Sequence, residues 1–217
     1  MDHAIFDTEH SPATNECRGR TERESKIRSS QGQVLVEFAC VLPLLLLLAF
    51  GVIELSFLMH DQHILIRLTR EGSNLISRDT KLGDAATAMT SMVNPPVDLT
   101  SANSKLIFTV LTNYSGSGPN NGKVIVYQRR EIGSLTAASV FNGSLSSTLF
   151  DSSTPDYYAI NPGANTNLQL AIVPANLVLA LGQSVYVTEI YTRHSLITAL
   201  DIFGVSLPTT LYSIAYF

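Results

Sequence analysis

The sequence predicts an α+β protein in which a long N-terminal helix packs, at its outer half, on an antiparallel β-sheet. Two observations lead to this expectation. The segment 34–59 is almost wholly apolar, and apolar residues then recur at helical spacing as far as residue 76. Beyond residue 96 the pattern changes to short strand-like runs, separated by segments rich in Ser, Gly, Pro and Asn.

The apolar segment Val34–Met59 has the length and composition of a membrane helix. Only Glu37 and Glu54 carry charge within it, and five consecutive leucines lie near its middle. A bilayer core needs about 20 mostly apolar residues in a helix. The run is longer than the apolar core of a secretory signal, and no small-residue cleavage site follows it. We therefore expect a retained transmembrane helix at residues 33–60.

The charges on either side of this helix predict its orientation. Five cations precede it within eleven residues: Arg18, Arg20, Arg23, Lys26 and Arg28. On the other side Asp61 comes before the first cation, Arg67. Because positive residues near a membrane stay in the cytoplasm, the N-terminus is expected inside the cell and the C-terminal part outside it.

The amino-acid composition argues against several classes of protein. Hydrophobic residues make up 45% of the 217-residue chain and charged residues 15%, which is too apolar for a disordered protein and too charge-poor for a typical cytosolic enzyme. The net charge of −4 offers no basic surface for nucleic acid. Cys17 lies in a polar stretch and Cys40 in the apolar run, so we expect no disulfide and an inert Cys40.

The start of the apolar run contains a possible processing site. Glu37 lies five residues after Gly32, at the expected cytoplasmic edge of the membrane, where an unpaired carboxylate is costly. Cleavage after Gly32 would give Gln33 a free amine, and in an assembly of staggered helices this ammonium could pair with Glu37 of a neighbour. A glycine before the cut also suits a protease that binds extended backbone.

These residues resemble a known family. A basic leader, Gly32, then Glu37-Phe38 and a leucine-rich helix with Pro43 are similar to the class III signal of type IV pilins and pseudopilins. Residues 51–55, GVIEL, and 70–73, REGS, resemble more specifically the TadE/TadG pseudopilins of tight-adherence (type IVc, Flp-type) pilus systems. Many type IV pilins have Phe after the cut, where this chain has Gln33, so N-terminal methylation is not implied.

The resemblance implies a pilin-like fold and a bacterial minor pilin that serves surface adhesion or biofilm formation. Gly32 and Gln33 would form the processing site of a prepilin peptidase, and Glu37, Phe38, Pro43 and Glu54 would act in assembly. Other implied partners are further pilins and pseudopilins, the inner-membrane assembly platform and membrane lipid. Loss of 32 of the 217 residues would leave 185, a size that favours a minor subunit of the filament or of the assembly machinery over a major pilin.

Other interpretations stay open at this stage. A single-pass membrane sensor or anchor with a ligand-binding periplasmic β domain, or a tethered hydrolase, would share the same hydropathy. No motif of a hydrolase, metalloprotease, phosphate loop or dinucleotide site occurs, so we expect no enzyme and no cofactor. His60, Asp61 and His63 suggest an interfacial polar cluster rather than a metal site. Glu54 could reach toward the outer interface or act in packing.

The resulting organisation has four parts: a cleaved cytoplasmic leader at 1–32, the membrane helix at 33–60, a helical stalk at 61–95 that ends at Pro95-Pro96, and an extracytoplasmic β-rich domain at 96–217. Residues 134–170 are expected to form an irregular segment and a candidate contact surface, and 174–181 a short helix or turn. The expected strands are 105–112, 123–128, 184–192 and 209–217.

Overall fold

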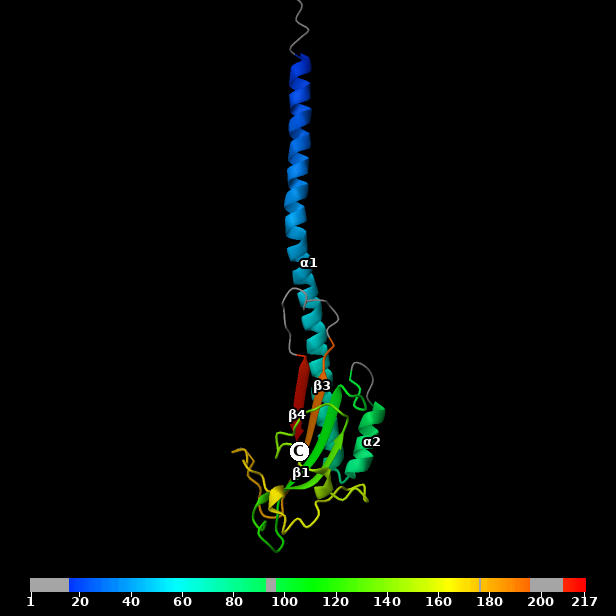
Figure 1. The fold of residues 1–217 in the computed structure, drawn as a ribbon, viewed down its shortest axis with the longest axis vertical. Helices are drawn as coiled ribbons and strands as arrows, with labels where there is room; N and C mark the ends of the chain where they lie inside the picture. Colours follow the sequence, from blue (N-terminus) through cyan, green and yellow to red (C-terminus); the bar gives the residue numbers. More distant parts are fainter. Residues whose placement is uncertain (1–15, 93–96, 176, 196–208) are drawn as a thin grey trace, which may run out of the picture. The chain divides into compact units, whose positions relative to one another are not determined.

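The computed structural model describes residues 16–92, 97–175, 177–195 and 209–217, with side chains from residue 32 onward. The chain divides into two compact units, residues 1–52 and 53–217, which are described separately. Helix α1, Glu16–Ser77, runs through both (Figure 1). Pro95-Pro96 lie outside the described residues.

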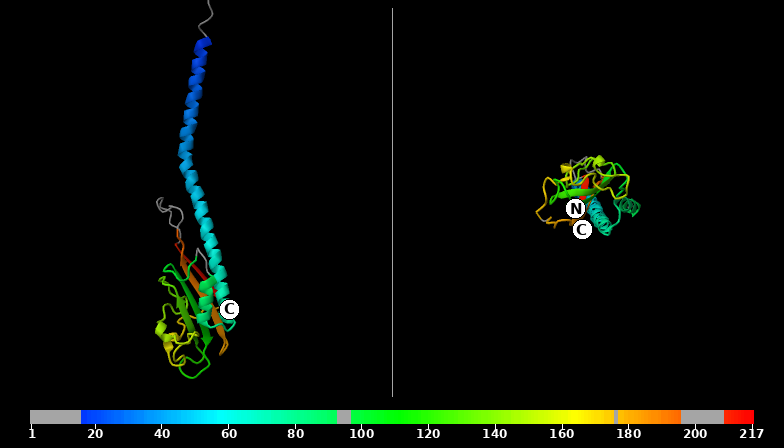
Figure 2. Two further views of the ribbon diagram at one scale, coloured as in Figure 1. Left: turned by 90° about the vertical axis from the view of Figure 1, so that its right-hand side faces the viewer. Right: turned by 90° about the horizontal axis from the view of Figure 1, so that it is seen from below.

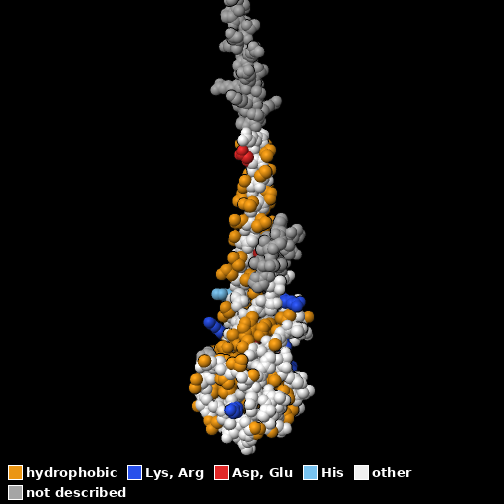
Figure 3. Space-filling model, turned by 60° about the vertical axis from the view of Figure 1, so that its left-hand side comes forward, with side chains coloured by type: hydrophobic (Ala, Val, Ile, Leu, Met, Phe, Trp, Pro, Cys, Tyr) orange, Lys and Arg blue, Asp and Glu red, His pale blue; other side chains and the backbone are white. Residues whose placement is uncertain are grey.

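In the first unit, the described chain is a single helix with its apolar side chains exposed. Figure 3 shows such side chains following the helix. From Gly32 to Ser77, α1 contains a window of mean hydropathy 2.6 of which none is buried, so the helix is long and apolar enough to cross a membrane. An N-terminal helix of this kind fits a single-pass membrane protein. The exposed large apolar residues of this unit are Val34, Leu35, Val36, Phe38, Val41, Leu42, Leu44, Leu45, Leu46, Leu48, Phe50 and Val52.

In the second unit, four antiparallel strands form one sheet in the order β2-β1-β3-β4. The strands are β1 Ser104–Asn113, β2 Val124–Ile132, β3 Ser184–Arg193 and β4 Thr210–Tyr216. Each contains most of one expected strand, which confirms the predicted α+β fold. Strand β2 continues four residues past its expected end because Arg129–Ile132 pair with Leu106–Thr109 of β1.

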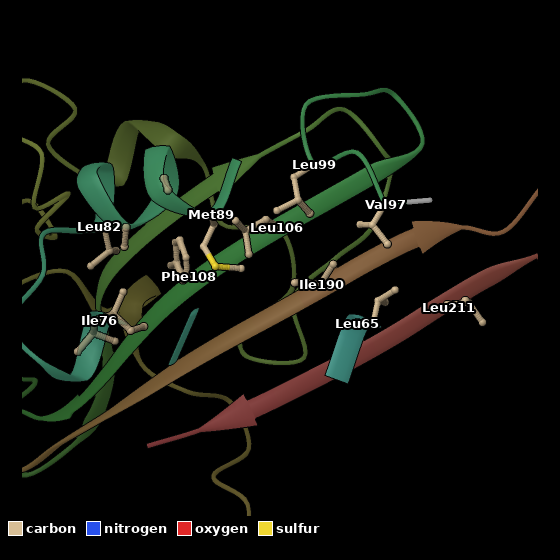
Figure 4. Close-up of a cluster of buried hydrophobic side chains, with 13 residues drawn as sticks. Leu65, Ile76, Leu82, Met89, Val97, Leu99, Leu106, Phe108, Ile190 and Leu211 are labelled. Atoms are coloured by element: carbon tan, nitrogen blue, oxygen red, sulfur yellow. The ribbon is translucent and has the colours of Figure 1, made fainter. Parts of the chain in front are cut away.

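The second part of α1 packs on one face of this sheet (Figure 2). Leu65 and Ile76 of α1 join Leu106, Phe108 and Ile190 of the sheet in one buried cluster (Figure 4). The helix comes very close to the strands at Gly72, where an added Cβ would lie 2.8 Å from Thr188 Cγ2 and 3.0 Å from Phe108 Cε1. Glycine is therefore required at this position for the observed packing.

Hydrogen bonds from α1 to β4 add to this contact. The Thr69 Oγ1 and Ser213 Oγ atoms lie 2.9 Å apart, and the Ser73 hydroxyl donates to the Ala215 carbonyl at 2.9 Å. All of these groups except the partly buried Ala215 are in buried residues. Because buried polar groups are costly without partners, these pairs determine the position of the helix along β4.

The stretch 61–95, expected as a helical stalk, holds the end of α1, a turn and a second helix. Asp79 in this turn has φ of 59°, a left-handed conformation that stops α1. Helix α2, Leu82–Met92, then packs on the same face of the sheet through Leu82, Ala85, Ala86 and Met89 (Figure 4). The break between α1 and α2 was not predicted from the sequence.

The opposite face of the sheet is covered by the irregular segment 134–170 (Figure 2). This segment contains two short 3₁₀ turns, η1 Ser147–Leu149 and η2 Thr166–Leu168. It closes a second core, which buries Leu111, Ile125, Phe141, Phe150, Leu168 and Val187. The segment is thus a part of the fold as well as a surface. Within the expected stretch 174–181, Leu177 N donates to Pro174 O at 2.8 Å, the hydrogen bond of a turn.

Charged and polar side chains of the sheet hold residues 137–143 in place. Lys105 Nζ donates to Ala137 O and Tyr191 Oη to Ala138 O, each at 2.9 Å. Glu189 accepts hydrogen bonds from the Ser139 hydroxyl and from Val140 N. Arg129 donates to the carbonyls of residues 141 and 143. Because Arg129 and Glu189 are buried, these bonds provide the partners that their charges need.

Candidate functional site

The residues expected at the processing site lie on the exposed surface of α1. Gly32, Gln33 and Glu37 are all exposed. Gln33 Nε2 donates to Glu37 Oε1 at 3.1 Å, one helical turn away. No atom lies within 4 Å of the position that a Cβ of Gly32 would occupy. Packing within the described chain therefore gives no reason for glycine at residue 32.

Phe38 and Pro43 also lie on the exposed helix of the first unit. Phe38 is 57% exposed, and Pro43 is inside α1. Proline leaves one backbone carbonyl of the preceding turn without its helical donor. No described side chain buries Phe38, so its ring is open to lipid or to another protein chain.

Glu54 differs from Glu37 because it is completely buried. Its Oε1 lies 3.2 Å from His194 Nε2, and the other ring nitrogen of His194, Nδ1, lies 2.6 Å from Asp61 Oδ2. A buried carboxylate that contacts a histidine does not reach toward water. In the structure Glu54 is therefore packed within its own chain.

This cluster, Glu54–His194–Asp61, follows from helix geometry and from strand register. Glu54 and Asp61 are seven residues apart, two helical turns, and so share one face of α1. His194 follows the end of β3, where its N–H donates to Thr209 O at 2.8 Å. In its protonated form the imidazole donates one N–H to each carboxylate, and such charge-assisted bonds are short and strong.

The neighbouring histidines do not join this cluster. His60 and His63 are both exposed. No group of three or more His, Cys, Asp or Glu side chains in the described ranges is arranged to hold a metal ion. A cavity of about 600 Å³ opens beside Asp61 and His194 and is also lined by Asp98 and Arg193.

Sequence reasoning named Glu54 and Asp61 but missed their partner. His194 is separated from Asp61 by 133 residues and from Glu54 by 140 residues. No local motif surrounds it. Two acids seven residues apart on one helix face could have indicated a shared cationic partner, but only the fold identifies which residue supplies it.

Comparison with protein families gives one match. Residues 32–74 match the family model described as TadE-like protein. This range includes Gly32, Glu37, Glu54 and Asp61, and the glycine at residue 72 that contacts β3. No curated protein and no solved structure matches the chain. Over this N-terminal stretch the chain is similar to the TadE-like family.

Proposed function

We propose that this chain is a minor pilin or pseudopilin that acts in the assembly of a tight-adherence (Flp-type) pilus, and so contributes to surface adhesion or biofilm formation. The TadE-like match associates the chain with the Tad pilus in general. The exposed apolar helix and the separate β-rich unit agree with a protein that is anchored in a membrane and presents a folded domain.

The proposed topology follows the charges and the helix. Residues 1–32 form a cytoplasmic leader that a prepilin peptidase removes, and 33–60 cross the bacterial inner membrane. Residues 61–95 and the β-rich domain 96–217 then lie in the periplasm, or outside the cell where the subunit enters a filament. The cations before the helix support this orientation.

The observation that carries the proposal is the contrast between the two acids of the apolar helix. Glu54 contacts His194 within its own chain. Glu37 is exposed on an apolar helix, has the amide of Gln33 as its hydrogen-bond partner, and makes no ion pair in the described part of the chain. Because a lone carboxylate in lipid is costly, Glu37 is suited to a cation from outside the chain. The α-ammonium of a neighbour's processed Gln33 supplies one.

Phe38 and Pro43 would support the same assembly. Both lie on the helix surface near Glu37 and are open to neighbours. In the proposed filament or assembly complex, Phe38 packs against the helices of other pilins or pseudopilins. The inner-membrane assembly platform and lipid contact the remaining apolar surface.

N-terminal sequencing of the protein from membranes of its native host tests this proposal. A mature chain that starts at Gln33 supports processing by the peptidase, and the Gly32→Val variant should then retain Met1. A wild-type chain that starts at Met1 would contradict the proposal. It would favour the alternative function, a single-pass sensor or anchor whose β domain binds a ligand.

A further inference from the structure

The two edges of the sheet differ in how well they are protected. Strand β2 forms one edge and β4 the other (Figure 1). The outer side of β2 is covered, because Tyr127 O accepts from Ala159 N at 2.8 Å and Val124 O accepts from Leu170 N at 3.0 Å. Its ladder with β1 also contains a register shift, and residues 129–131 are all charged. Natural proteins protect sheet edges with such charges, bulges and covering segments, because an open edge pairs with other chains.

Strand β4 has none of these protecting features. Its seven residues, Thr210–Tyr216, include no charged residue, no proline and no glycine. They pair with β3 in one register without a shift. No bridge or backbone hydrogen bond of the described ranges covers the outer side of β4. This edge therefore has the properties of a strand that accepts another strand.

The outer backbone groups of β4 follow from its ladder with β3. Tyr186 and Phe217 exchange two hydrogen bonds, at 2.8 and 2.9 Å, at one end of this ladder. Such pairs alternate along an antiparallel ladder, so every second residue of β4 directs its N–H and C=O away from β3. These residues are Thr210, Tyr212, Ile214 and Tyr216. Gln62 Nε2 donates to the carbonyl of Tyr212 at 3.2 Å, and the other outer groups have no partner in the described part of the chain.

Apolar side chains lie at the end of this edge. Tyr216 is 48% exposed and Phe217 is 55% exposed. With Pro174, Leu177 and Val185 they line a small cavity of about 240 Å³. Exposed apolar surface beside unpaired backbone groups is typical of an interaction site. Because the edge carries no charge, it suits a strand that is also uncharged.

Strand β4 of a second copy meets this requirement. A two-fold pair joins the same surface of each chain, and two strands that continue one sheet through the same edge then run antiparallel. Full overlap about Ser213 places Thr210 opposite Tyr216 of the second copy, and Tyr212 opposite Ile214 of the second copy. Each outward residue then faces an outward residue, so the free N–H and C=O groups of both edges find partners. We propose that β4 pairs edge to edge with β4 of a second copy of this chain.

The direction of β4 determines which second copy can be the partner. Thr69 contacts Ser213, and Ser73 contacts Ala215, so β4 runs in the same direction as this part of α1. An antiparallel partner therefore carries its own α1 in the reverse direction. In the topology proposed above, all chains of one membrane face the same way. If β4 pairs in this topology, the partner is held by another membrane or another filament.

Sedimentation equilibrium of the full-length chain in detergent micelles tests the pairing. We expect a reversible dimer of the wild type. The variant with Thr210→Lys and Tyr216→Lys puts lysines directly opposite each other, and should raise the Kd of the dimer by about tenfold or more. Both positions are exposed. The matched control, Thr87→Lys with Ser91→Lys, adds the same charge on the exposed side of α2 and should dimerise as the wild type does.

A charge exchange separates lost pairing from a damaged fold. The variant with Thr210→Glu and Tyr216→Glu should also lose its own dimer. A mixture of the lysine and glutamate variants should recover a heterodimer, because each lysine then faces a glutamate. A wild type that stays monomeric at all concentrations would overturn the proposal. So would a lysine variant that dimerises like the wild type, as expected for association through the apolar helix, or a mixture without heterodimer.

Phosphatidylcholine vesicles that carry the full-length chain test the arrangement between membranes. Vesicles with the lysine variant and vesicles with the glutamate variant should aggregate only when they are mixed, which turbidity measures. Heterodimers in micelles without vesicle aggregation would overturn the partner in another membrane and retain the pairing of β4. The micelle results do not depend on N-terminal processing, so the pairing of β4 and the pilin proposal can fail separately.

Discussion

His194 Nδ1 lies 2.6 Å from Asp61 Oδ2, and this contact joins the residue after β3 to helix α1. The side chains of His194 and Asp61 are 2% and 10% exposed, and that of Glu54, on the other side of the ring, is fully buried. One histidine therefore contacts two buried acids.

Replacing His194 by alanine should strongly destabilise the second unit. The change removes the imidazole that contacts two buried carboxylates, and removing one partner of a buried pair costs about 3–5 kcal/mol. Thermal unfolding of the full chain in micelles, followed by circular dichroism, measures the loss. His60→Ala, at an exposed histidine, is the control and should be neutral. The double variant His194→Ala with Glu54→Gln should recover part of the loss. Equal stability of the His194→Ala and His60→Ala variants would contradict the cluster's role.

Replacing Glu37 by alanine should prevent pilus assembly and leave membrane insertion unchanged. The variant lacks the exposed carboxylate that we propose to pair with a neighbour's processed N-terminus, and insertion of a more apolar helix is not disfavoured. Electron microscopy of surface pili and membrane fractionation measure the two effects. Asp79→Asn serves as a control, because asparagine accepts the left-handed conformation at residue 79. Normal piliation of the Glu37→Ala strain would refute the proposed pairing.

Replacing Gly72 by alanine should destabilise the contact between α1 and the sheet. The new Cβ would meet Thr188 Cγ2 at 2.8 Å, and overpacking of this kind costs about 1–3 kcal/mol. The matched control is Gly51→Ala, since no atom lies within 4 Å of that position. Alanine there should be neutral or slightly stabilising. Denaturant unfolding of both variants makes the comparison, and an unaffected Gly72→Ala protein would show that the helix can move away from β3.

Alkaline pH should destabilise the second unit through Tyr191. Burial, together with the charge of Glu189, raises the pKa of Tyr191 from 10.0 to about 12. The folded state therefore keeps its phenol proton where the unfolded chain loses it, so stability is complete below pH 10 and falls as pH rises toward 12. Phenolate absorbance and circular dichroism, recorded together, measure this window. Tyr191→Phe should reduce the loss, and an unchanged pH profile would contradict this origin.

The long apolar helix and the strand positions could be predicted because their signals are local. Length and apolarity identify a spanning helix, and runs of β-branched residues identified most of β1, β3 and β4. The prediction ended β2 too early because Arg129, Arg130 and Glu131 do not resemble a strand. All three residues pair with β1. Arg129 also donates to the carbonyls of residues 141 and 143, Arg130 stacks on Tyr157, and Glu131 pairs with Lys105.

The sequence by itself determined that this protein has one long apolar helix with an acid near each end, a TadE-like N-terminal segment and a β-rich C-terminal part. Only the tertiary structure decided that Glu54 is paired within the chain, that Gly72 must lack a side chain, and that β4 forms one edge of the sheet. The physical reason is the separation along the sequence over which each kind of signal acts. Hydropathy and periodicity act over one or two helical turns, whereas the partner of a buried charge depends on strand register and packing between residues more than a hundred positions apart.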